Sequence, residues 1–287
     1  MTSVQRERVT DNIYVFTSNL YAQVTAGLIV TGAGAILIDT LVYPEETRQI
    51  KRFVEERLGT RVQFVINTHF HADHTTGTCF FPDAQIIAQE RCRALIDERG
   101  REGLERMRAS HAEMRDSFIV LPTITFDQTI TLHFGGKTLE MWSTPGHSPD
   151  SIVVHIREDQ VLFAADTLMS LPYFVDGDYD DFIRSLESFR GRSYESIVQG
   201  HGEVLLRGEV EEKIQNDLDY LVKLRHAVDA ALATNNPQSA LRAIDIEDCG
   251  KSRILLNGAA QQLHQQNVMW LAERRAAALS LRLENGK

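Results

Sequence analysis

The sequence predicts an α+β protein in which two layers of β-sheet are covered on the outside by helices. Strand-like apolar runs occur in two groups, one before residue 90 and one after residue 120, with a charged helical segment between them. The 287 residues, 43% of them hydrophobic, can bury a large core as a single domain. Beyond Gly208 the apolar residues recur at helical spacing, which predicts further helices at the C-terminus.

The first group of strands is short and aliphatic. The predicted strands are Ile13–Phe16, Gly27–Val30, Ala35–Asp39, 62–66 and Gln85–Ala88, and Pro44–Leu58 is a predicted helix. The segment Arg91–Asp116 has the composition of a charged helix, interrupted near Gly100 and Gly103. Such an inserted helix is expected to lie over a cleft as a wall or lid.

The second group reads as antiparallel strands joined by short turns. The predicted strands are Ile124–Phe126, Thr129–His133, Thr138–Trp142, Ile152–Ile156, Val161–Ala164 and 196–199. The run Phe134-Gly135-Gly136-Lys137 predicts a hairpin turn. A helix is expected over Asp180–Arg190, and long amphipathic helices over Val210–Leu232 and Gln261–Leu283. The apolar faces of the last two are expected to be buried within the chain or against a second copy of it.

Three histidines and an aspartate follow the strand 62–66 within six positions: His69, His71, Asp73 and His74. Residues two apart in an extended segment point the same way, so His69 and His71 can bind one ion. The turn that follows directs Asp73 and His74 towards a second. Imidazole with carboxylate suits zinc and tolerates iron or manganese. A solvated polar turn is the alternative, but four ligand-type residues in six positions favour a metal site.

Three more ligand-type residues follow predicted strands. His147 lies in the turn Thr144-Pro145-Gly146-His147-Ser148, Asp166 comes just after Val161–Ala164, and His201 stands between two glycines after the strand 196–199. Glycine lets the backbone approach a ligand closely. Because neutral imidazoles alone cannot hold two dications close together, an additional carboxylate such as Asp166 is needed for a paired site.

Four motifs occur along the chain in this order: His-x-His-x-Asp-His, Thr-Pro-Gly-His-Ser, an aspartate after Leu-Phe-Ala-Ala, and Gly-His-Gly. The same order is found in the metallo-β-lactamase-fold superfamily, which the chain resembles over about residues 10–206. The resemblance implies an αββα sandwich of two mostly antiparallel sheets with outer helices, with residues 207–287 as a helical extension packed on this catalytic core. The implied ligands are His69, His71 and His147 for one divalent ion, Asp73, His74 and His201 for the other, and Asp166 between them. A hydroxide shared by the two ions, expected to be Zn²⁺ with Fe or Mn possible, is the implied nucleophile.

Two residues are candidates for direct roles in catalysis. Asp73 can carry a proton to the leaving group, as a carboxylate beside a reacting oxygen should. Tyr173 follows Asp166 closely, so its phenol could stabilise a developing oxyanion. In the resembling family an aspartate at the position of Asp39 accepts a hydrogen bond from a ligand histidine, and the alternative for Asp39 is a turn residue that caps the next segment. Thr68 and Ser148 are weaker candidates for such contacts.

Other residues could contact a substrate, although simpler interpretations exist. The aromatic candidates for a pocket lining are Phe80, Phe81, Tyr173, Phe174 and Tyr179, and ordinary core packing is the alternative for each. Lys251 and Arg253 could hold a substrate anion, but surface salt bridges are the more economical interpretation. The acidic run 176–181 lacks the distal glutamate of a calcium loop, so helix capping explains it better.

Composition restricts the partners. With 30 basic and 40 acidic residues the formal charge is −10, which disfavours nucleic acid as a ligand. The N-terminal residues lack an apolar signal core, and no run reaches the roughly 20 apolar residues of a membrane span. Three cysteines suit a reducing compartment. A cytoplasmic enzyme with a small-molecule substrate and no membrane partner is therefore expected.

The leading hypothesis is a dinuclear metal hydrolase that acts on a small ester, lactone or thioester, because no basic cluster that could grip a phosphate lies beside the ligands. Phosphoesters, phosphotriesters and β-lactams are alternative substrates of the same site, although zinc β-lactamases usually carry Cys or Ser where Asp166 stands. A mononuclear iron dioxygenase acting on persulfides is an alternative from another enzyme class, in which Asp73 and His74 have no metal role. A purely structural metal does not need seven ligands.

Overall fold

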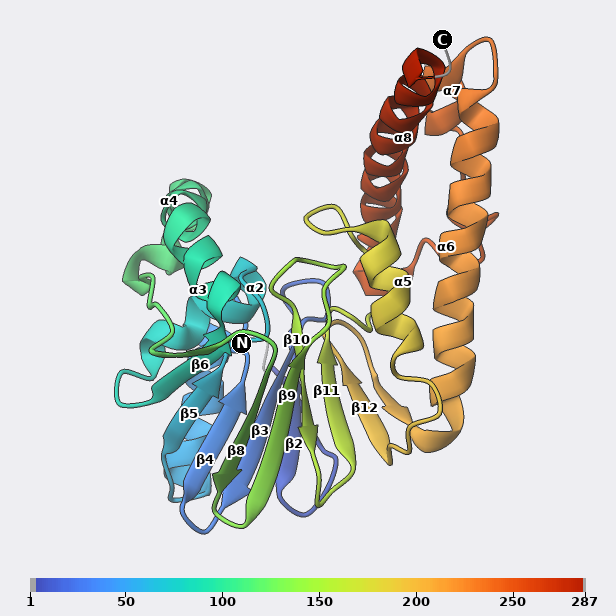
Figure 1. The fold of residues 1–287 in the computed structure, drawn as a ribbon. Helices are drawn as coiled ribbons and strands as arrows, with labels where there is room; N and C mark the ends of the chain where they lie inside the picture. Colours follow the sequence, from blue (N-terminus) through green and yellow to red (C-terminus); the bar gives the residue numbers. More distant parts are fainter. Residues whose placement is uncertain (1–3, 286–287) are drawn as a thin grey trace.

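The computed structural model describes residues 4–285, with side chains as far as residue 277. Two β-sheets stack face to face, and helices cover their outer surfaces (Figure 1). The first sheet has the order β1-β2-β3-β4-β5-β6-β7, with β1 Gln5–Arg8, β2 Ile13–Thr17, β3 Thr25–Thr31, β4 Gly34–Ile38, β5 Val62–Ile66, β6 Gln85–Gln89 and β7 Ile124–Phe126. The second has the order β13-β12-β11-β10-β9-β8, with β8 Thr129–Phe134, β9 Lys137–Ser143, β10 Ile152–Ile156, β11 Val161–Ala165, β12 Ser196–Gln199 and β13 Val204–Leu206.

Both sheets contain parallel and antiparallel pairs. In the first sheet β1 to β4 are antiparallel, whereas β4, β5, β6 and β7 run parallel to one another. In the second sheet β11 and β12 form the parallel pair, and the other neighbours are antiparallel. The carboxyl ends of parallel strands lie at one edge of a sheet, so the segments after β4, β5, β11 and β12 can meet there.

Strand alternation builds three apolar layers. The residues of one strand face point between the sheets, as Ile36, Ile66 and Phe163 do. Their immediate neighbours in the chain, such as Leu37 and Val65, point outward and pack under the first helices. Both faces of the central strands are therefore covered, which explains why every residue of β4 is buried. The predicted αββα arrangement is confirmed.

The helices before the second sheet cover the first sheet and the edge where the ligands lie. They are α1 Pro44–Arg52, α2 Ala72–Thr75, α3 Glu90–Leu95 and α4 Arg101–Ser110. A single π-helical turn, Ile96–Gly100, connects α3 and α4 without a break. The predicted interruption of the α-helix near Gly100 is therefore present as this π-turn, whereas the one near Gly103 is wrong. The turn changes the hydrogen-bond register, but the chain stays helical through both glycines.

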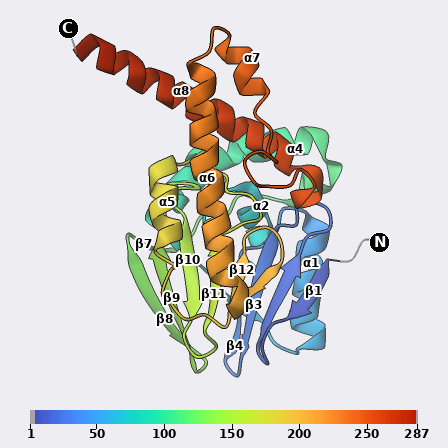
Figure 2. The same cartoon turned by 90° about the vertical axis from the view of Figure 1, so that its right-hand side faces the viewer.

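The second sheet is covered by α5 (Tyr179–Glu187) and by the C-terminal extension, whose helices are α6 Val210–Leu232, α7 Pro237–Arg242 and α8 Ala260–Asn285. One apolar cluster joins Leu162 and Ile197 of the sheet to Phe182 of α5 and to Tyr220 and Leu224 of α6. The apolar face of α6 is thus buried within the chain. The far part of α8 runs away from the sheets (Figure 2).

Two sequence predictions about the strands need comment. The segment Ile124–Phe126 was expected with the second group, but it pairs in parallel with β6 at the edge of the first sheet, so that prediction is wrong. A three-residue strand carries too little periodicity to reveal its partner. The hairpin between β8 and β9 is as predicted, because Gly135 (φ 56°) and Gly136 (φ 83°) both adopt the left-handed conformation that its tight turn requires.

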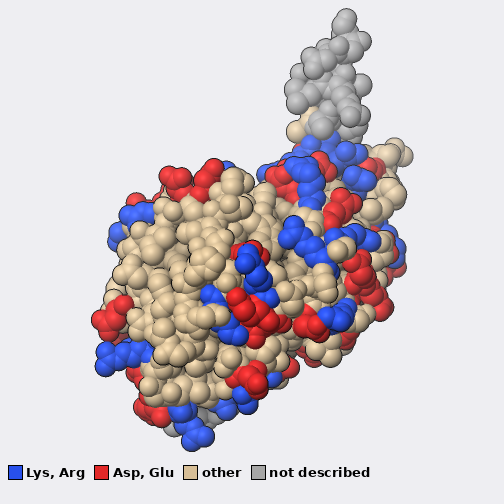
Figure 3. All heavy atoms as spheres, turned by 60° about the horizontal axis from the view of Figure 1, so that its bottom comes forward, with Lys and Arg blue, Asp and Glu red and all other residues tan. Residues whose placement is uncertain are grey.

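The charged side chains are mixed on the surface, and the cysteines are unpaired. Charged side chains of both signs lie beside one another on the face shown in Figure 3, without a large area of one sign. The cysteines Cys79, Cys92 and Cys249 are buried and unpaired. In the part of the chain that the structure describes, no helix is both long enough and apolar enough to cross a bilayer.

Candidate metal centre

The seven residues that the motifs singled out converge at one edge of the sandwich. His69 and His71 follow β5, and Asp73 and His74 lie in α2 immediately after them. The other three come from the second sheet: His147 from the connection between β9 and β10, Asp166 from the end of β11, and His201 from the end of β12. Each side chain is thus fixed by a strand end or by the first turn after one, which makes the arrangement rigid.

The donor atoms fall into two groups. His69, His71, His147 and Asp166 each offer one atom within 4.8 Å of the others, and Asp73, His74 and His201 form a second set by the same measure. Asp166 connects them, because its Oδ2 lies 3.3 Å from His147 Nε2 and its Oδ1 lies 3.3 Å from His74 Nε2. This grouping matches the ligand assignment that the family resemblance implied. We refer to the seven residues as the donor cluster.

In each of the five histidines one ring nitrogen is engaged by an acceptor outside the donor cluster, or by a hydroxyl that can accept. His74 Nδ1 lies 2.8 Å from Asp39 Oδ2, and His71 Nε2 lies 2.9 Å from Asp176 Oδ2. His147 Nδ1 and His201 Nδ1 meet the carbonyl oxygens of Tyr173 at 2.7 Å and Ala22 at 2.9 Å. His69 Nδ1 lies 3.1 Å from the hydroxyl of Thr68. Such contacts place the ring proton on the outer nitrogen and leave the inner one as a lone-pair donor.

The interior of the donor cluster is consequently rich in acceptors. The inner nitrogen of His71 lies 3.0 Å from that of His69 and 2.9 Å from that of His147. The buried atoms His74 Nε2 and Asp166 Oδ1 have no hydrogen-bond partner. Lone pairs facing one another in a buried site are unfavourable unless a cation lies between them. The residues therefore fit divalent metal ions of the type that binds imidazole and carboxylate.

Gly200 permits the close approach of two of these strands. A Cβ atom at this position would lie 1.9 Å from Asp166 Oδ1, so any larger residue would push the carboxylate out of the donor cluster. The sequence analysis expected the glycines beside His201 to allow close packing around a ligand. The structure shows that Gly200 makes room for Asp166.

Burial and the neighbouring carboxylates shift the pKa values of the histidines in opposite directions. Burial lowers the pKa of His69 and, with His71 nearby, lowers that of His147 to about 4. Burial also opposes protonation of His201, but Asp166 and Asp73 outweigh it and raise its pKa to about 10. A metal ion that binds beside His201 therefore competes with a proton and releases it on binding.

Asp39 makes the contact that the resemblance implied. It is buried after β4 and accepts from the backbone N–H of Thr68 at 2.9 Å, from the Thr68 hydroxyl at 2.7 Å and from His74. Because the Thr68 hydroxyl also meets His69 Nδ1, one carboxylate orients a histidine in each donor group. Ser148 instead bonds Ser151 at 2.7 Å behind His147.

Sequence reasoning missed Asp176, which accepts from His71 and lies 3.8 Å from Arg99 Nη1. It stands in the acidic run that we interpreted as a helix cap. The cap is Asp178, which accepts from the N–H groups of Asp180 and Asp181. The histidine partners Tyr173 and Ala22 contribute only backbone carbonyls, which no side-chain motif can signal. The loop with Ala22 also brings Tyr21 to the edge of the donor cluster, where the Asp73 carboxylate and burial raise the pKa of its phenol.

The C-terminal extension holds the loop that supplies Asp176 and the Tyr173 carbonyl. The side chain of Asn267 in α8 donates to the carbonyl of Pro172 at 2.7 Å and accepts from the N–H of Phe174 at 3.3 Å. Asn267 is fully buried and also donates to the phenol of Tyr220 at 3.2 Å. The extension therefore braces a loop that orients two histidines of the donor cluster.

The structure does not support the proposed role of Tyr173 in catalysis. Its hydroxyl donates to Gln266 Oε1 of α8 at 2.7 Å, while its backbone carbonyl accepts a hydrogen bond from His147 Nδ1. Burial raises the pKa of this phenol to about 12. The phenol thus attaches the loop to the extension, and the residue serves the donor cluster through its main chain.

We therefore expect Tyr173→Phe to leave turnover nearly unchanged and to cost about 1 kcal/mol of unfolding free energy, since one hydrogen bond is lost and the carbonyl remains. Steady-state kinetics and thermal unfolding of the variant check this. A fall in kcat of about 10²- to 10³-fold, typical for loss of an oxyanion donor, would restore the role in catalysis.

The remaining candidates lie elsewhere. Phe81, Phe174 and Tyr179 are core residues, and Phe80 packs against the core under the first sheet. Arg253 forms surface ion pairs with Asp245 and Glu247. Lys251 is buried, not at the surface, and shares Asp217 with Lys213 through contacts of 2.6 Å and 2.5 Å. Lys251 thus forms an ion pair with Asp217 inside the extension.

A family model described as the metallo-beta-lactamase superfamily matches residues 21–228. A beta-lactamase-like protein 2 homolog of Caenorhabditis elegans is 26% identical over 199 residues, covering 68% of this chain and 61% of that protein. The atrochrysone carboxyl ACP thioesterase of Aspergillus fumigatus is 23% identical over 214 residues, covering 75% of this chain and 60% of the thioesterase. The chain thus spans about three fifths of the length of these relatives.

Solved structures share the fold. A metallo-beta-lactamase from Pontibacter korlensis superimposes with a TM-score of 0.62 at 19% identity, covering 75% of this chain and 100% of the other. At this identity the likeness concerns the fold alone. The α6 to α8 extension begins at Val210, shortly before the family match ends at residue 228.

Proposed function

Because the chain belongs to the metallo-beta-lactamase superfamily, we propose that it is a hydrolase that cleaves a small ester, lactone or thioester at a dinuclear metal site. The observation that carries the proposal is the outward engagement of all five histidines, which leaves five ring nitrogens and the carboxylates Asp73 and Asp166 as the inner donors. Two paired divalent ions, when bound, lower the pKa of a shared water and polarise the substrate carbonyl.

The two-group arrangement favours a pair of ions over one. A mononuclear site would use only His69, His71 and His147 with Asp166. Asp73 would then lie beside His201 at 3.2 Å and beside His74 at 3.7 Å without a metal to explain its place. The buried Nε2 of His74 has no hydrogen-bond partner and faces both carboxylates, which argues in the same direction. Zinc is the ion that this donor set suits best.

Two arguments favour carbonyl substrates over phosphoesters. Lys251 and Arg253, the basic residues considered for binding an anion, are both engaged in ion pairs of the extension, and Arg99 reaches Asp176 rather than an inner donor atom. A dianionic phosphate bound near the Asp73 and Asp166 carboxylates would therefore receive no hydrogen bond from any of these three basic side chains to offset the repulsion between the negative charges. The Aspergillus fumigatus relative is named as a thioesterase, which supports the thioester among the three carbonyl classes.

Within the chain, Asp73 is the side chain best suited to move the proton. Its side chain is 15% exposed, whereas that of Asp166 is 4% exposed, so Asp73 can reach a leaving group at the opening of the donor cluster. Its carboxylate would receive a proton from the attacking water and deliver it to the departing sulfur or oxygen. His201 Nε2 lies 3.2 Å from Asp73 Oδ2, so the two side chains face the same space.

A substrate panel tests the proposal. The zinc-loaded protein should hydrolyse acyl thioesters of N-acetylcysteamine, p-nitrophenyl esters or simple lactones with a higher kcat/KM than bis-p-nitrophenyl phosphate or a chromogenic cephalosporin. Bound metal is measured on the same sample and should be about two ions per chain. A protein that cleaves only the phosphodiester or only the cephalosporin would overturn the choice of substrate class.

A further inference from the structure

The inserted helical segment encloses a cavity of about 320 Å³ beside the donor cluster. Its lining is largely apolar and includes Phe70, Ile96, Leu104, Met107 and Ile119. A volume of this size lies at the lower end of those of small-molecule sites. Polar side chains also contribute to the lining, among them Thr75, Thr76 and Arg106, but the apolar ones suit an apolar chain or ring of modest size.

This cavity borders the proposed site at His71. His71 and Asp176 line it, and they are the hydrogen-bonded pair that fixes one histidine of the donor cluster. Arg99, also in the lining, lies over the ring of Phe70 at 5.5 Å and close to Asp176, which keeps its charge at the rim. A substrate whose carbonyl lies at the donor cluster can thus extend past His71 into the cavity.

The helical face that lines the cavity contains two glycines. Ile96, Gly100, Gly103 and Met107 recur at helical spacing and all contribute to the lining. A side chain at Gly100 would press on Ile119 at 3.2 Å, but a Cβ at Gly103 would meet nothing within 4 Å. Glycine inside a helix costs about 1 kcal/mol relative to alanine. The packing supplies no reason for that cost at Gly103, whereas an open cavity does.

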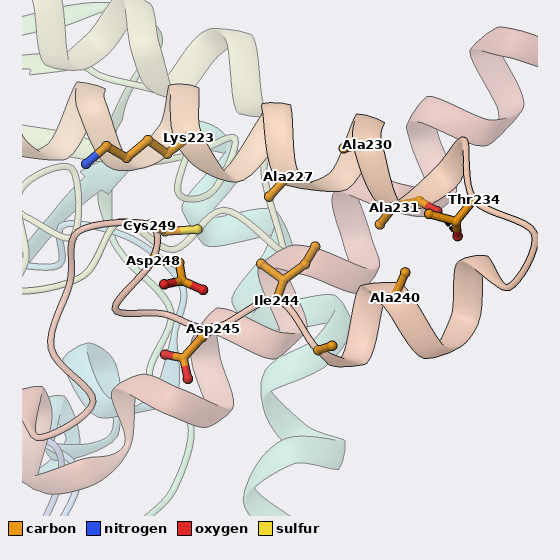
Figure 4. A pocket seen from close by; sticks show the side chains of 11 residues that line it. Lys223, Ala227, Ala230, Ala231, Thr234, Ala240, Ile244, Asp245, Asp248 and Cys249 are labelled. Carbon is orange, nitrogen blue, oxygen red and sulfur yellow. Dashed lines mark hydrogen bonds between the residues drawn. The ribbon is translucent and has the colours of Figure 1, made fainter.

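A second cavity, of about 350 Å³, lies away from the donor cluster. It lies in the extension between α6 and α7 (Figure 4), and its walls include Ala227, Ala230, Ala231 and Ala240. The described residues that line it include none of the donor cluster.

We propose that the cavity under α4 binds the acyl group of the substrate, so that the enzyme acts on esters or thioesters of medium-length, apolar acids. This inference rests on the proposed function and narrows its substrate class. The oxygen of water joins the acyl carbon, the carbon–sulfur bond breaks, and the released thiol takes the remaining proton. Only the chain beyond the carbonyl enters the cavity.

Filling the cavity tests this. Acyl thioesters of N-acetylcysteamine from acetyl to decanoyl should show kcat/KM rising about fourfold for each methylene that the cavity buries. In Gly103→Leu the ratio of kcat/KM for decanoyl over acetyl should fall at least about tenfold. Leucine is a good helix former and meets open space there, so the fold should persist. In Met107→Ala, which enlarges the cavity, the preference should move towards longer chains.

The matched control is Gly208→Leu, since Gly208 also faces open space but lies in the turn after β13. It should keep the wild-type ratio. Binding is measured separately with the thioether S-decyl-N-acetylcysteamine, which cannot be hydrolysed. The wild type should bind it more tightly than the S-ethyl compound, and Gly103→Leu should lose that difference.

The two proposals can fail independently. If thioesters are cleaved but Gly103→Leu keeps the wild-type chain-length profile and both thioethers bind alike, the acyl cavity is wrong and the hydrolase stands. If no ester, lactone or thioester is cleaved, the proposed function is wrong. The thioether measurements then decide the cavity alone, since tighter binding of the S-decyl compound that Gly103→Leu abolishes supports it and equal binding overturns it.

Discussion

Replacing His69 by alanine is expected to lower the kcat of ester or thioester hydrolysis by about a thousandfold, the rate equivalent of several kcal/mol of lost metal catalysis. His69 is fully buried, and its Nε2 lies 3.0 Å from the inner nitrogen of His71 and 3.9 Å from Asp166 Oδ2. Its loss removes one donor from the first group. Bound metal should therefore fall from about two ions per chain to about one.

Metal analysis and kinetics on one preparation check this result, together with chelation of the wild-type protein and restoration by zinc. His226→Ala is the control, because His226 is exposed on α6 and lies outside the donor cluster. Full turnover by the metal-free wild type would contradict the dinuclear mechanism. One iron per chain with oxygen uptake on glutathione persulfide would instead favour the dioxygenase alternative.

The donor cluster could be predicted because its residues follow strands. A strand end is visible in the sequence as an apolar run that stops at a turn, and His69, His147, Asp166 and His201 each stand at or shortly after such a point. The chain order of the motifs then pointed to one cleft. Their joint position depends on the parallel pairing of β4 with β5 and of β11 with β12, which brings those strand ends to the same edge.

The residues that orient the histidines could not be predicted in the same way. Asp176 contacts a histidine 105 positions earlier, and Asn267 contacts a backbone 95 positions earlier, so both depend on tertiary packing. Ala22 and Tyr173 act through their carbonyl groups, which are the same for any residue. Tyr173 illustrates the difficulty, because its nearness to Asp166 in sequence suggested a role for the phenol, whereas the loop turns the phenol towards α8.

Two edge strands, β1 and β13, could not be predicted from the sequence either. The exposed strand β1, with the sequence Gln-Arg-Glu-Arg, has no apolar alternation, and the three-residue β13 is too short to show any. Their pairing with β2 and β12 comes from backbone hydrogen bonds rather than from side-chain burial. The spacing of apolar residues in a sequence indicates which side chains are buried, so it gave no sign of β1 or β13.

Asp39→Asn is expected to weaken metal binding at the His74 group by about 10- to 100-fold and to lower kcat/KM by a similar factor. The carboxylate now accepts the Nδ1 proton of His74 at 2.8 Å, which leaves Nε2 free to bind a metal. An asparagine amide turned towards His74 donates instead, so the proton moves to Nε2 and blocks the ligand atom. The backbone should tolerate the change, because asparagine accepts the left-handed φ of 57° at this position.

The size of the loss in metal affinity shows whether Asp39 orients His74 or only stabilises the turn after β4. The amide oxygen can still accept from the N–H of Thr68, so a residue that only caps the turn would lose little on becoming asparagine. Competition with a chelator measures the affinity of each ion, and thermal unfolding of the metal-free protein measures stability. Asp178→Asn is the control, since asparagine caps the start of α5 as well as aspartate does. Unchanged metal affinity in Asp39→Asn would leave Asp39 as a turn residue and remove the mechanism that fixes His74.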